Sequence, residues 1–469
     1  MPLTIRSLVT ASLIVAFAPA LVLAEGDDPP PVQVTLSPMP ASDPPLKYRL
    51  WPDFVDRIHG NAAVYYGKVR SSQDSLFGDR ELWDKIDHSD TQPLQSLRED
   101  DDQLLARLTF QSPPLYYLRQ GALCTNCDWQ LPVDREPYFT ILLPEMQDSR
   151  QFCRLLCAVA RNDVAHGRID EAIIALQTNY ALARNVGGSE PLVGGLVGLA
   201  IAGVGDQQVL TLIQQPEAPN LYWALCELPR PLVDISLAIR AETSSVELMF
   251  PDLRNCLSES MTTEQARQLF FKVWRGLVAV LDDAPDEDAL AVLASVPAYT
   301  AAKARLVEQG FTTERVESMP APQVLLADAY LIYRRSSDLC VAAFELPFAD
   351  SIRVSRQADS AMAQAAPKAP LPTLLRAIRP SMEGARIAQV RLERELAVLR
   401  LLEALRMHAA ANDGRLPETL AEISVVPVPV DPVTARPFEW SLRDGVAELS
   451  GPKLKNHSCQ YEIRMRATP

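Results

Sequence analysis

The sequence predicts a mainly α-helical protein: an array of helical hairpins followed by a small α+β unit with a long helix and a β-hairpin. Two observations support this. From Leu46 to about Val354, apolar residues recur at three- and four-residue spacing, while continuous alternation with period two is scarce. Near the other end, Asp444-Gly445 separates two short alternating segments, which is a strong hairpin signal.

Composition narrows the function classes before any motif is considered. The 469 residues include 45 Lys and Arg against 59 Asp and Glu, so the net charge is 45 − 59 = −14. A general nucleic-acid binder needs a basic face to neutralise phosphates, and a membrane-surface protein of the polybasic type needs one for anionic lipids. Both classes are disfavoured. The 48% hydrophobic content indicates a folded chain.

The first 24 residues have the layout of a secretory signal peptide. Arg6 precedes an uncharged, mostly apolar run over residues 7–24, and Val22 and Ala24 supply compact residues for a cleavage site. We therefore expect an exported protein, periplasmic or extracellular after cleavage between Ala24 and Glu25. A retained membrane anchor is the alternative, since 18 residues is the lower edge of a spanning helix. The next best candidate, residues 191–205, is too short to span.

Two segments rich in proline divide the remaining chain. Residues 25–46 carry seven prolines and are predicted to be a disordered arm, because proline excludes helix and interior strand. Residues 357–372 are rich in Ala and Pro and are predicted to be a linker. The expected domains are thus a helical domain over residues 47–356 and a C-terminal unit over residues 373–469.

Helical periodicity is clearest in the middle of the chain, at residues 150–165, 169–186, 192–213, 221–228 and 232–249. The third of these is unusually rich in small residues. Gly194, Gly198 and Ala202 recur every four residues on one face, which predicts close packing against a neighbouring helix. They do not match a nucleotide-binding glycine motif.

In the C-terminal unit, Ser381 is predicted to cap a long helix that ends near Ala411. That helix carries one leucine stripe, with Arg and Glu on its other faces. Pairing around Asp444-Gly445 sets Leu442 opposite Ala447 and Trp440 opposite Leu449. The predicted core of this unit comprises Leu396, Leu399, Trp440, Leu442 and Leu449.

Residues 167–176 resemble the second helix of a tetratricopeptide repeat. Gly167 stands where that motif ends its first helix, and Ala172 where it lets two helices approach closely; Asn179 departs from the motif's second Ala. Only one such unit is clear over residues 150–186, whereas a stable array needs about three. The resemblance implies a helical hairpin.

A wider resemblance is to a family of exported planctomycete proteins of unknown function. It is carried by residues 46–50, 60–63, 127–129, 167–184, 192–198 and 214–225, spread over about two thirds of the chain. It implies architecture and export but no chemistry. The segments at residues 414–420 and 431–438 are similar to the soluble part of type II secretion pseudopilins. Pseudopilins carry a hydrophobic N-terminal helix, whereas the corresponding helix here is internal, so this implies a small fold rather than pilus assembly.

Four clustered cysteines are the main chemical candidates: Cys124, Cys127, Cys153 and Cys157. In an exported protein with eight cysteines we expect one or two structural disulfides. Two alternatives remain open. One is a four-thiolate zinc site, and the other is a redox pair in which Cys124 has a lowered pKa.

No other catalytic motif stands out, and the five histidines are separated from one another. We therefore expect an exported, non-catalytic scaffold without a cofactor that binds a protein or peptide partner. The alternative is an exported thiol oxidoreductase or zinc-dependent hydrolase that uses the clustered cysteines.

Overall fold

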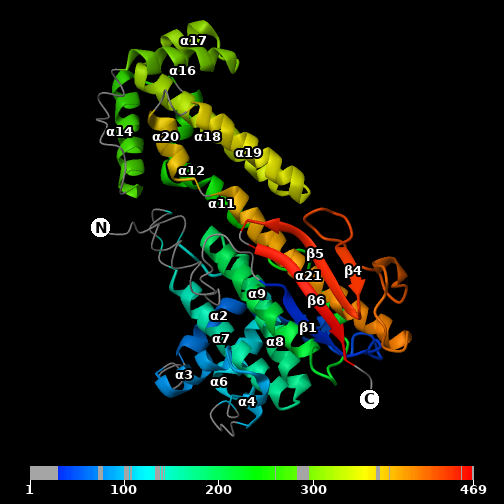
Figure 1. Cartoon of the computed structure of the whole chain (residues 1–469). Coiled ribbons are helices and arrows are strands. Elements are labelled where there is room, and N and C mark those ends of the chain that lie inside the picture. The colour runs from blue at the N-terminus through cyan, green and yellow to red at the C-terminus, as the bar shows by residue number, and fades with distance from the viewer. Residues whose placement is uncertain are drawn as a thin grey trace. The chain divides into compact units, whose positions relative to one another are not determined.

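The computed structural model describes residues 30–71, 78–99, 105, 108–132, 138, 141, 143–258, 260–281, 295–365, 370–379, 381–455 and 457–466. The predicted signal peptide, residues 1–24, lies outside this set. The fold is mainly α-helical with a small sheet built largely from the C-terminal end (Figure 1), which confirms the predicted class.

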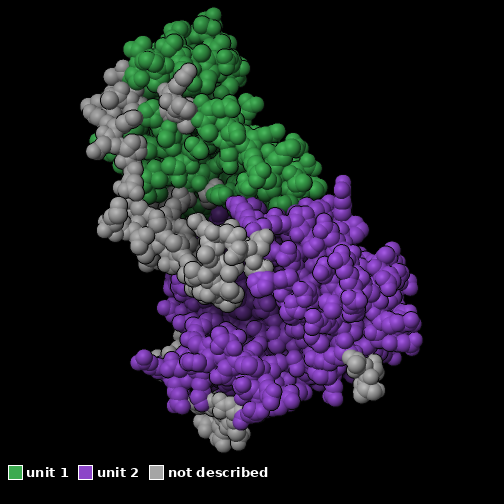
Figure 2. Space-filling model, in the orientation of Figure 1, with its two compact units in different colours: residues 1–5, 130–142, 236–386 green, residues 6–129, 143–235, 387–469 purple. Residues whose placement is uncertain are grey.

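The described chain forms two compact units, coloured separately in Figure 2. Unit 1 contains Gln130–Leu142 and Ser236–Arg386, and unit 2 contains the described residues before Gln130 together with Leu143–Ile235 and Ile387–Pro469. The predicted division into residues 47–356 and 373–469 is therefore wrong. The C-terminal segment belongs to the same unit as the N-terminal helices, because buried polar groups and a parallel strand tie them together.

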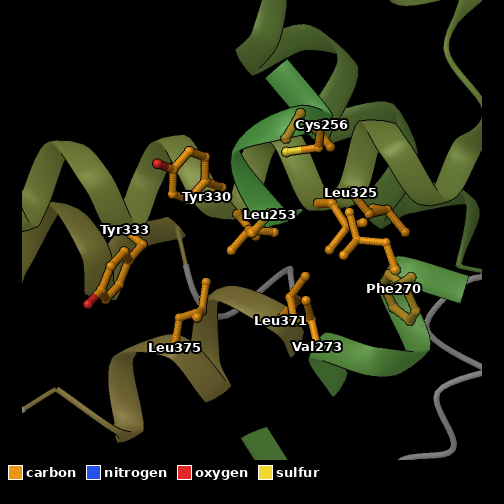
Figure 3. Close-up of a cluster of buried hydrophobic side chains, with 14 of the residues drawn as sticks. Leu253, Cys256, Phe270, Val273, Leu325, Tyr330, Tyr333, Leu371 and Leu375 are labelled. Atoms are coloured by element: carbon orange, nitrogen blue, oxygen red, sulfur yellow. The ribbon is translucent and has the colours of Figure 1, made fainter. Parts of the chain in front are cut away.

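Unit 1 is helical. Its elements are α11 (Ser236–Thr243), α12 (Ser245–Met249), η3 (Pro251–Arg254), α13 (Asn255–Ser258), α14 (Thr263–Val280), α16 (Val296–Glu308), α17 (Thr313–Ser318), α18 (Ala321–Phe344), α19 (Phe348–Ala365) and α20 (Pro370–Ala377). The central helix α18 packs against α14, α16, α19 and α20. Figure 3 shows apolar side chains of α14, α18 and α20 converging, with Phe270 and Val273 from α14 close to Leu325 of α18.

The predicted linker at residues 357–372 is also wrong. Residues 357–365 are the last turns of α19, and residues 370–372 begin α20. Alanine is the strongest helix former, so an Ala-rich segment continues a helix when its few larger side chains find a core. Met362 and Leu371 are both buried in the core of unit 1. Residues 366–369 lie outside the described set.

Unit 2 combines helices with the sheet. Its helical elements are η1 (Phe54–Asp56), α2 (Ala62–Ser71), α3 (Arg80–Ser89), α4 (Leu94–Glu99), α6 (Pro113–Leu123), α7 (Pro144–Ala165), α8 (Ile169–Gly187), α9 (Leu192–Ile213), α10 (Tyr222–Glu227), most of α21 (Met382–Ala411) and η5 (Leu420–Glu422). The most extensive helix–helix contacts of this unit join α7, α8 and α9. Two short strands, β2 (Ile58–Asn61) and β3 (Cys124–Asn126), pair in parallel beside it.

The main sheet has the order β1-β6-β5-β4, from β1 (Val32–Leu36), β4 (Glu439–Arg443), β5 (Val446–Leu454) and β6 (His457–Met465). The predicted hairpin is confirmed: Leu442 pairs with Ala447 and Trp440 with Leu449. Ala447 and Leu449 are buried, whereas Trp440 and Leu442 are half-buried. The indole of Trp440 donates a hydrogen bond to the carbonyl of Pro417 at 3.1 Å.

Strand β1 contradicts the predicted disorder of residues 25–46. It pairs in parallel with β6, with Val34 opposite Ile463. The segment Val32–Leu36 contains no proline, and its alternation buries Val34 and Leu36 in the core. The prolines stand on both sides of the strand, where they do not interrupt the ladder.

Helix α21 runs its full predicted length and is capped by Ser381, whose Oγ accepts a hydrogen bond from the amide of Gly384 at 3.0 Å. Beneath β5 and β6 (Figure 1) it is buried on several faces. Leu399 is buried and Leu396 half-buried, as befits the predicted stripe. The expected polar faces are not solvated, since Arg394 and Arg406 are also buried. Each of these guanidinium groups pairs with a buried carboxylate.

Helix α9 alone in the described chain is long and apolar enough to cross a membrane, with a mean hydropathy of 1.6. Most of it is buried against α7 and α8 within unit 2, as in the core helix of a folded protein. Its small residues explain the close packing. A Cβ added at Gly198 would lie 2.5 Å from the carbonyl oxygen of Ala183 and from the Cα of Gly187.

Candidate functional site

The helix-packing residues predicted from the sequence lie in one layer of unit 2. Gly194 faces the turn between α8 and α9, where an added Cβ would meet the Ser189 hydroxyl. Ala172 and Ala202 are fully buried. Gly167 ends α7 with a φ of +73°, a left-handed conformation that glycine adopts without steric cost.

The four clustered cysteines do not form disulfides, and all eight cysteines of the chain are free thiols. Cys153 and Cys157 lie one turn apart on α7, with 4.0 Å between their Sγ atoms. Consecutive turns of a rigid helix hold the two side chains side by side without the geometry that a disulfide needs. Both are buried, and the neighbouring Cys153 together with burial raises the pKa of Cys157. The predicted disulfides are therefore wrong, and this pair fills the core.

Cys124 and Cys127 lie in a different part of unit 2, where α6 ends. Trp129 stacks on Tyr66 with 5.7 Å between ring centroids, and its indole donates to the carbonyl of Asn185 at 2.9 Å. The Asn185 amide in turn donates to the Tyr66 hydroxyl at 2.8 Å. Burial raises the pKa of Cys127 to about 12 and also raises the pKa of Cys124. A redox nucleophile needs a lowered pKa, so the oxidoreductase reading of Cys124 is not supported.

The positions of the four cysteines do not support the zinc site. Within the residues that the structure describes, no group of three or more His, Cys, Asp or Glu side chains is arranged to hold a metal ion. The electrostatic neighbours of Cys127 are Cys124 and Asp128, whereas those of Cys157 are Cys153 and Asp90. The two pairs thus occupy separate environments and do not converge on a tetrahedral site.

An exposed apolar pair in unit 2 was not anticipated from the sequence. Phe54 and Val55 form the single turn η1, and each is 81% exposed. The signal that could have identified them is an apolar dipeptide between Asp53 and Asp56 in a segment that also contains proline. Isolated exposed apolar residues are ordinary, but a large aromatic beside a second apolar side chain on a well-held loop is typical of a binding anchor.

The loop that carries this pair is fastened to the helical layer from two sides. The Gln177 side-chain amide on α8 donates to the carbonyls of Arg49 and Trp51, both at 3.1 Å. The Arg49 guanidinium forms ion pairs with Asp53, at 3.2 Å, and with Glu227. The backbone on the N-terminal side of η1 is therefore fixed, while the two apolar side chains point away from any core contact.

A second feature of unit 2 is a small cavity between α9, α21 and β6. Its volume is about 10 Å³, and acidic and phenolic groups line it, among them Asp206, Glu395 and Tyr461. This is room for about one water molecule, which excludes an organic substrate. The feature of the sequence that could have indicated this cavity is Asp206, an acidic residue inside the mostly apolar segment 192–213.

Comparison of the chain with known protein families, with curated proteins and with solved structures finds no match.

Proposed function

We propose that this chain is an exported, non-catalytic helical scaffold that binds a protein or peptide partner through Phe54 and Val55. The observation that carries the proposal is their 81% exposure on a loop held by Gln177 and Arg49. Because the loop backbone is already held, little backbone entropy is lost when these side chains enter a partner's pocket. Aromatic anchors of this kind supply much of the energy of an interface.

Export is the second part of the proposal, and it rests on the N-terminal segment before residue 25. It is tested by the N-terminal sequence of the protein isolated from its source. A chain that begins at Glu25 supports cleavage, and one that retains residues 1–24 points to the anchored alternative.

Binding is tested by a photo-crosslinking amino acid placed at residue 54 in the full-length protein within the native envelope. The matched control is residue 296, because Val296 is 71% exposed but belongs to unit 1. We expect one recurrent crosslinked species from position 54 and none from position 296. The same species from both positions, or none from position 54, would contradict the proposal.

A double variant, Phe54→Ser with Val55→Ser, provides the complementary measurement. Because neither side chain packs in a core, unfolding stability should change by no more than about 0.5 kcal/mol. A crosslinker moved to the neighbouring residue 56 should then lose the recurrent species in the double variant and keep it in the Val296→Ser control. Retention of the species in both would place the contact elsewhere.

A further inference from the structure

The cavity of unit 2 contains an acidic group for which the described residues provide no ion pair. Asp206 is 2% exposed, in the interior of α9. One carboxyl oxygen, Oδ1, accepts a hydrogen bond from the Tyr180 hydroxyl of α8 at 2.6 Å. The other oxygen, Oδ2, is buried without a partner among the described residues. A bare carboxylate oxygen in this position would carry a large desolvation cost.

The opposite wall of the cavity carries the second acid, Glu395 of α21, which does have a cationic partner. Its Oε1 accepts from the Arg391 guanidinium at 3.0 Å. His457 of β6 lies 3.6 Å from the same oxygen, and burial lowers its pKa to about 4, so this ring is neutral at pH 7. Among the described residues Arg391 is thus the cation that pairs with Glu395.

Phenols supply the remaining titratable groups around the cavity. Tyr461 of β6 lines the cavity. Tyr180 of α8 donates its hydrogen bond to Asp206, and the buried thiol of Cys157 on α7 is an electrostatic neighbour of the Tyr180 hydroxyl. Burial raises the pKa of both phenols, which keeps them neutral and able to donate. Two acids therefore line a cavity with room for one water, and one of them, Glu395, pairs with Arg391.

We propose that Asp206 carries a proton on Oδ2 at neutral pH and donates it through one water in the cavity toward the Glu395 carboxylate. The two acids then hold a single negative charge, which Arg391 balances, and the shared proton joins α9 to α21. When the pH exceeds the raised pKa of Asp206 the proton is lost, and two facing carboxylates repel each other. The shared proton therefore makes the stability of unit 2 decrease as the pH rises.

The electrostatic environment agrees with the assignment of the proton. Burial and then the charge of Glu395 raise the pKa of Asp206 well above its ordinary value, while Arg391 limits the rise in the pKa of Glu395. A group whose pKa is raised by folding contributes stability below its unfolded pKa, and that contribution is lost as the pH rises through the folded value. The stability of unit 2 therefore declines as the pH rises from the unfolded pKa of aspartate toward the raised folded pKa of Asp206.

The test compares Asp206→Asn with Asp431→Asn in the full-length protein, by thermal unfolding at pH 6 and pH 9. Asparagine mimics a protonated aspartate and does not ionise on unfolding, so we expect the wild-type melting temperature to fall relative to that of Asp206→Asn between pH 6 and pH 9. Asp431 is equally buried but accepts two hydrogen bonds from the Arg394 guanidinium, both at 3.0 Å. Asp431→Asn should lower the melting temperature at both pH values.

Infrared spectroscopy of wild-type protein with ¹³C-labelled aspartate keeps the proposal testable if the variant does not fold. A protonated aspartate carboxyl band at pH 7 that disappears on alkaline titration is the expected result. Absence of that band overturns the proposal, as does an Asp206→Asn variant that is destabilised at both pH values. A rise in the wild-type melting temperature with NaCl or CaCl₂ that Asp206→Asn abolishes also overturns it, because the cavity would then hold a cation.

Discussion

Glu403 and Arg406, three residues apart on α21, form an ion pair in which both side chains are completely buried, with 3.0 Å between Oε2 and Nη1. The Arg406 guanidinium also donates to the carbonyls of Ser37 and Pro219, both at 3.1 Å. Glu403 accepts from the backbone amide of Leu221 at 3.0 Å. One pair on the C-terminal helix thereby satisfies backbone groups from two distant segments of unit 2.

Removal of one partner of this pair should be far more harmful than removal of both. Arg406→Met leaves the Glu403 carboxylate buried without a counter-charge, and we expect a loss of about 3–5 kcal/mol of unfolding stability. Arg406→Met combined with Glu403→Gln removes that unpaired charge and should recover part of the loss. Urea unfolding followed by circular dichroism measures both; equal losses in the single and double variants would show that the two residues are not coupled.

Close packing between α8 and α9 should make Gly198 intolerant of a methyl group. Gly198→Ala directs its Cβ at backbone atoms of α8, which cannot rotate away, so we expect destabilisation of at least about 1–3 kcal/mol. Gly67→Ala is the matched control, since nothing lies within 4 Å of its added Cβ in helix α2. That change should be neutral or stabilising by up to about 1 kcal/mol. Thermal unfolding should show a lowered melting temperature for Gly198→Ala and no decrease for Gly67→Ala.

The free thiols predict the outcome of a cysteine titration. Eight thiols should react in denatured, unreduced protein, because the chain contains eight cysteines and none is bridged. In the native protein Cys124 should react while Cys153 and Cys157 remain protected, since only Cys124 of the three is partly exposed. Its rate should increase with pH, because burial raises its pKa. A Cys124→Ser variant identifies the signal; fewer than eight thiols would contradict the structure.

Glu247 should make unit 1 sensitive to acid. Burial opposes its ionisation, but hydrogen bonds from Tyr330 and Arg254 and the charge of Arg334 outweigh burial and lower the pKa of Glu247 below its ordinary value of 4.5. A lowered pKa contributes stability above the unfolded value and loses it as the pH falls through the folded value. The melting temperature of Glu247→Gln should therefore lie below the wild type at pH 7, with the gap closing below about pH 4.

Glu264→Gln on the surface of α14 is the control for that measurement. Its carboxylate also pairs with an arginine, Arg267, at 2.8 Å, but in full contact with water. Exposed pairs contribute little to stability, so its melting temperature should follow the wild type at every pH. An equal effect of both variants would mean that burial of Glu247 is not the cause.

Periodicity alone predicted much of the secondary structure in unit 2. Helix α9 has the bounds expected from the sequence, and the register of the hairpin follows from its two-residue turn. These features depend on neighbouring residues, whose spacing is visible in the chain. The sequence reading failed where distant residues decide the outcome. Strand β1 is short and looks like part of a proline-rich arm until β6 is available to pair with it.

The prediction that the charged side chains of α21 are exposed was wrong for a related reason. An amphipathic helix usually places its Arg and Glu residues on solvated faces, so exposure of Arg394 and Arg406 was the natural expectation. Their burial depends on Asp431 and Glu403 and on backbone carbonyls far away in the sequence. The candidate site shows the same limit, because Asp206 gains a partner acid only when α9 and α21 are brought together in the fold.

The parallel pairing of β1 with β6 has a consequence for biosynthesis. Gln33 and Glu462, whose side chains hydrogen-bond at 2.9 Å across these strands, are 429 residues apart. At ribosomal rates of 5–20 residues per second, β1 waits roughly 20 to 90 seconds for its partner to be translated. The nascent chain must shield an apolar strand for that time, whereas the continuous segment Ser236–Arg386 can emerge and fold in between. Completion of unit 2 is thus the last event of synthesis, which makes early translation products a target for chaperones.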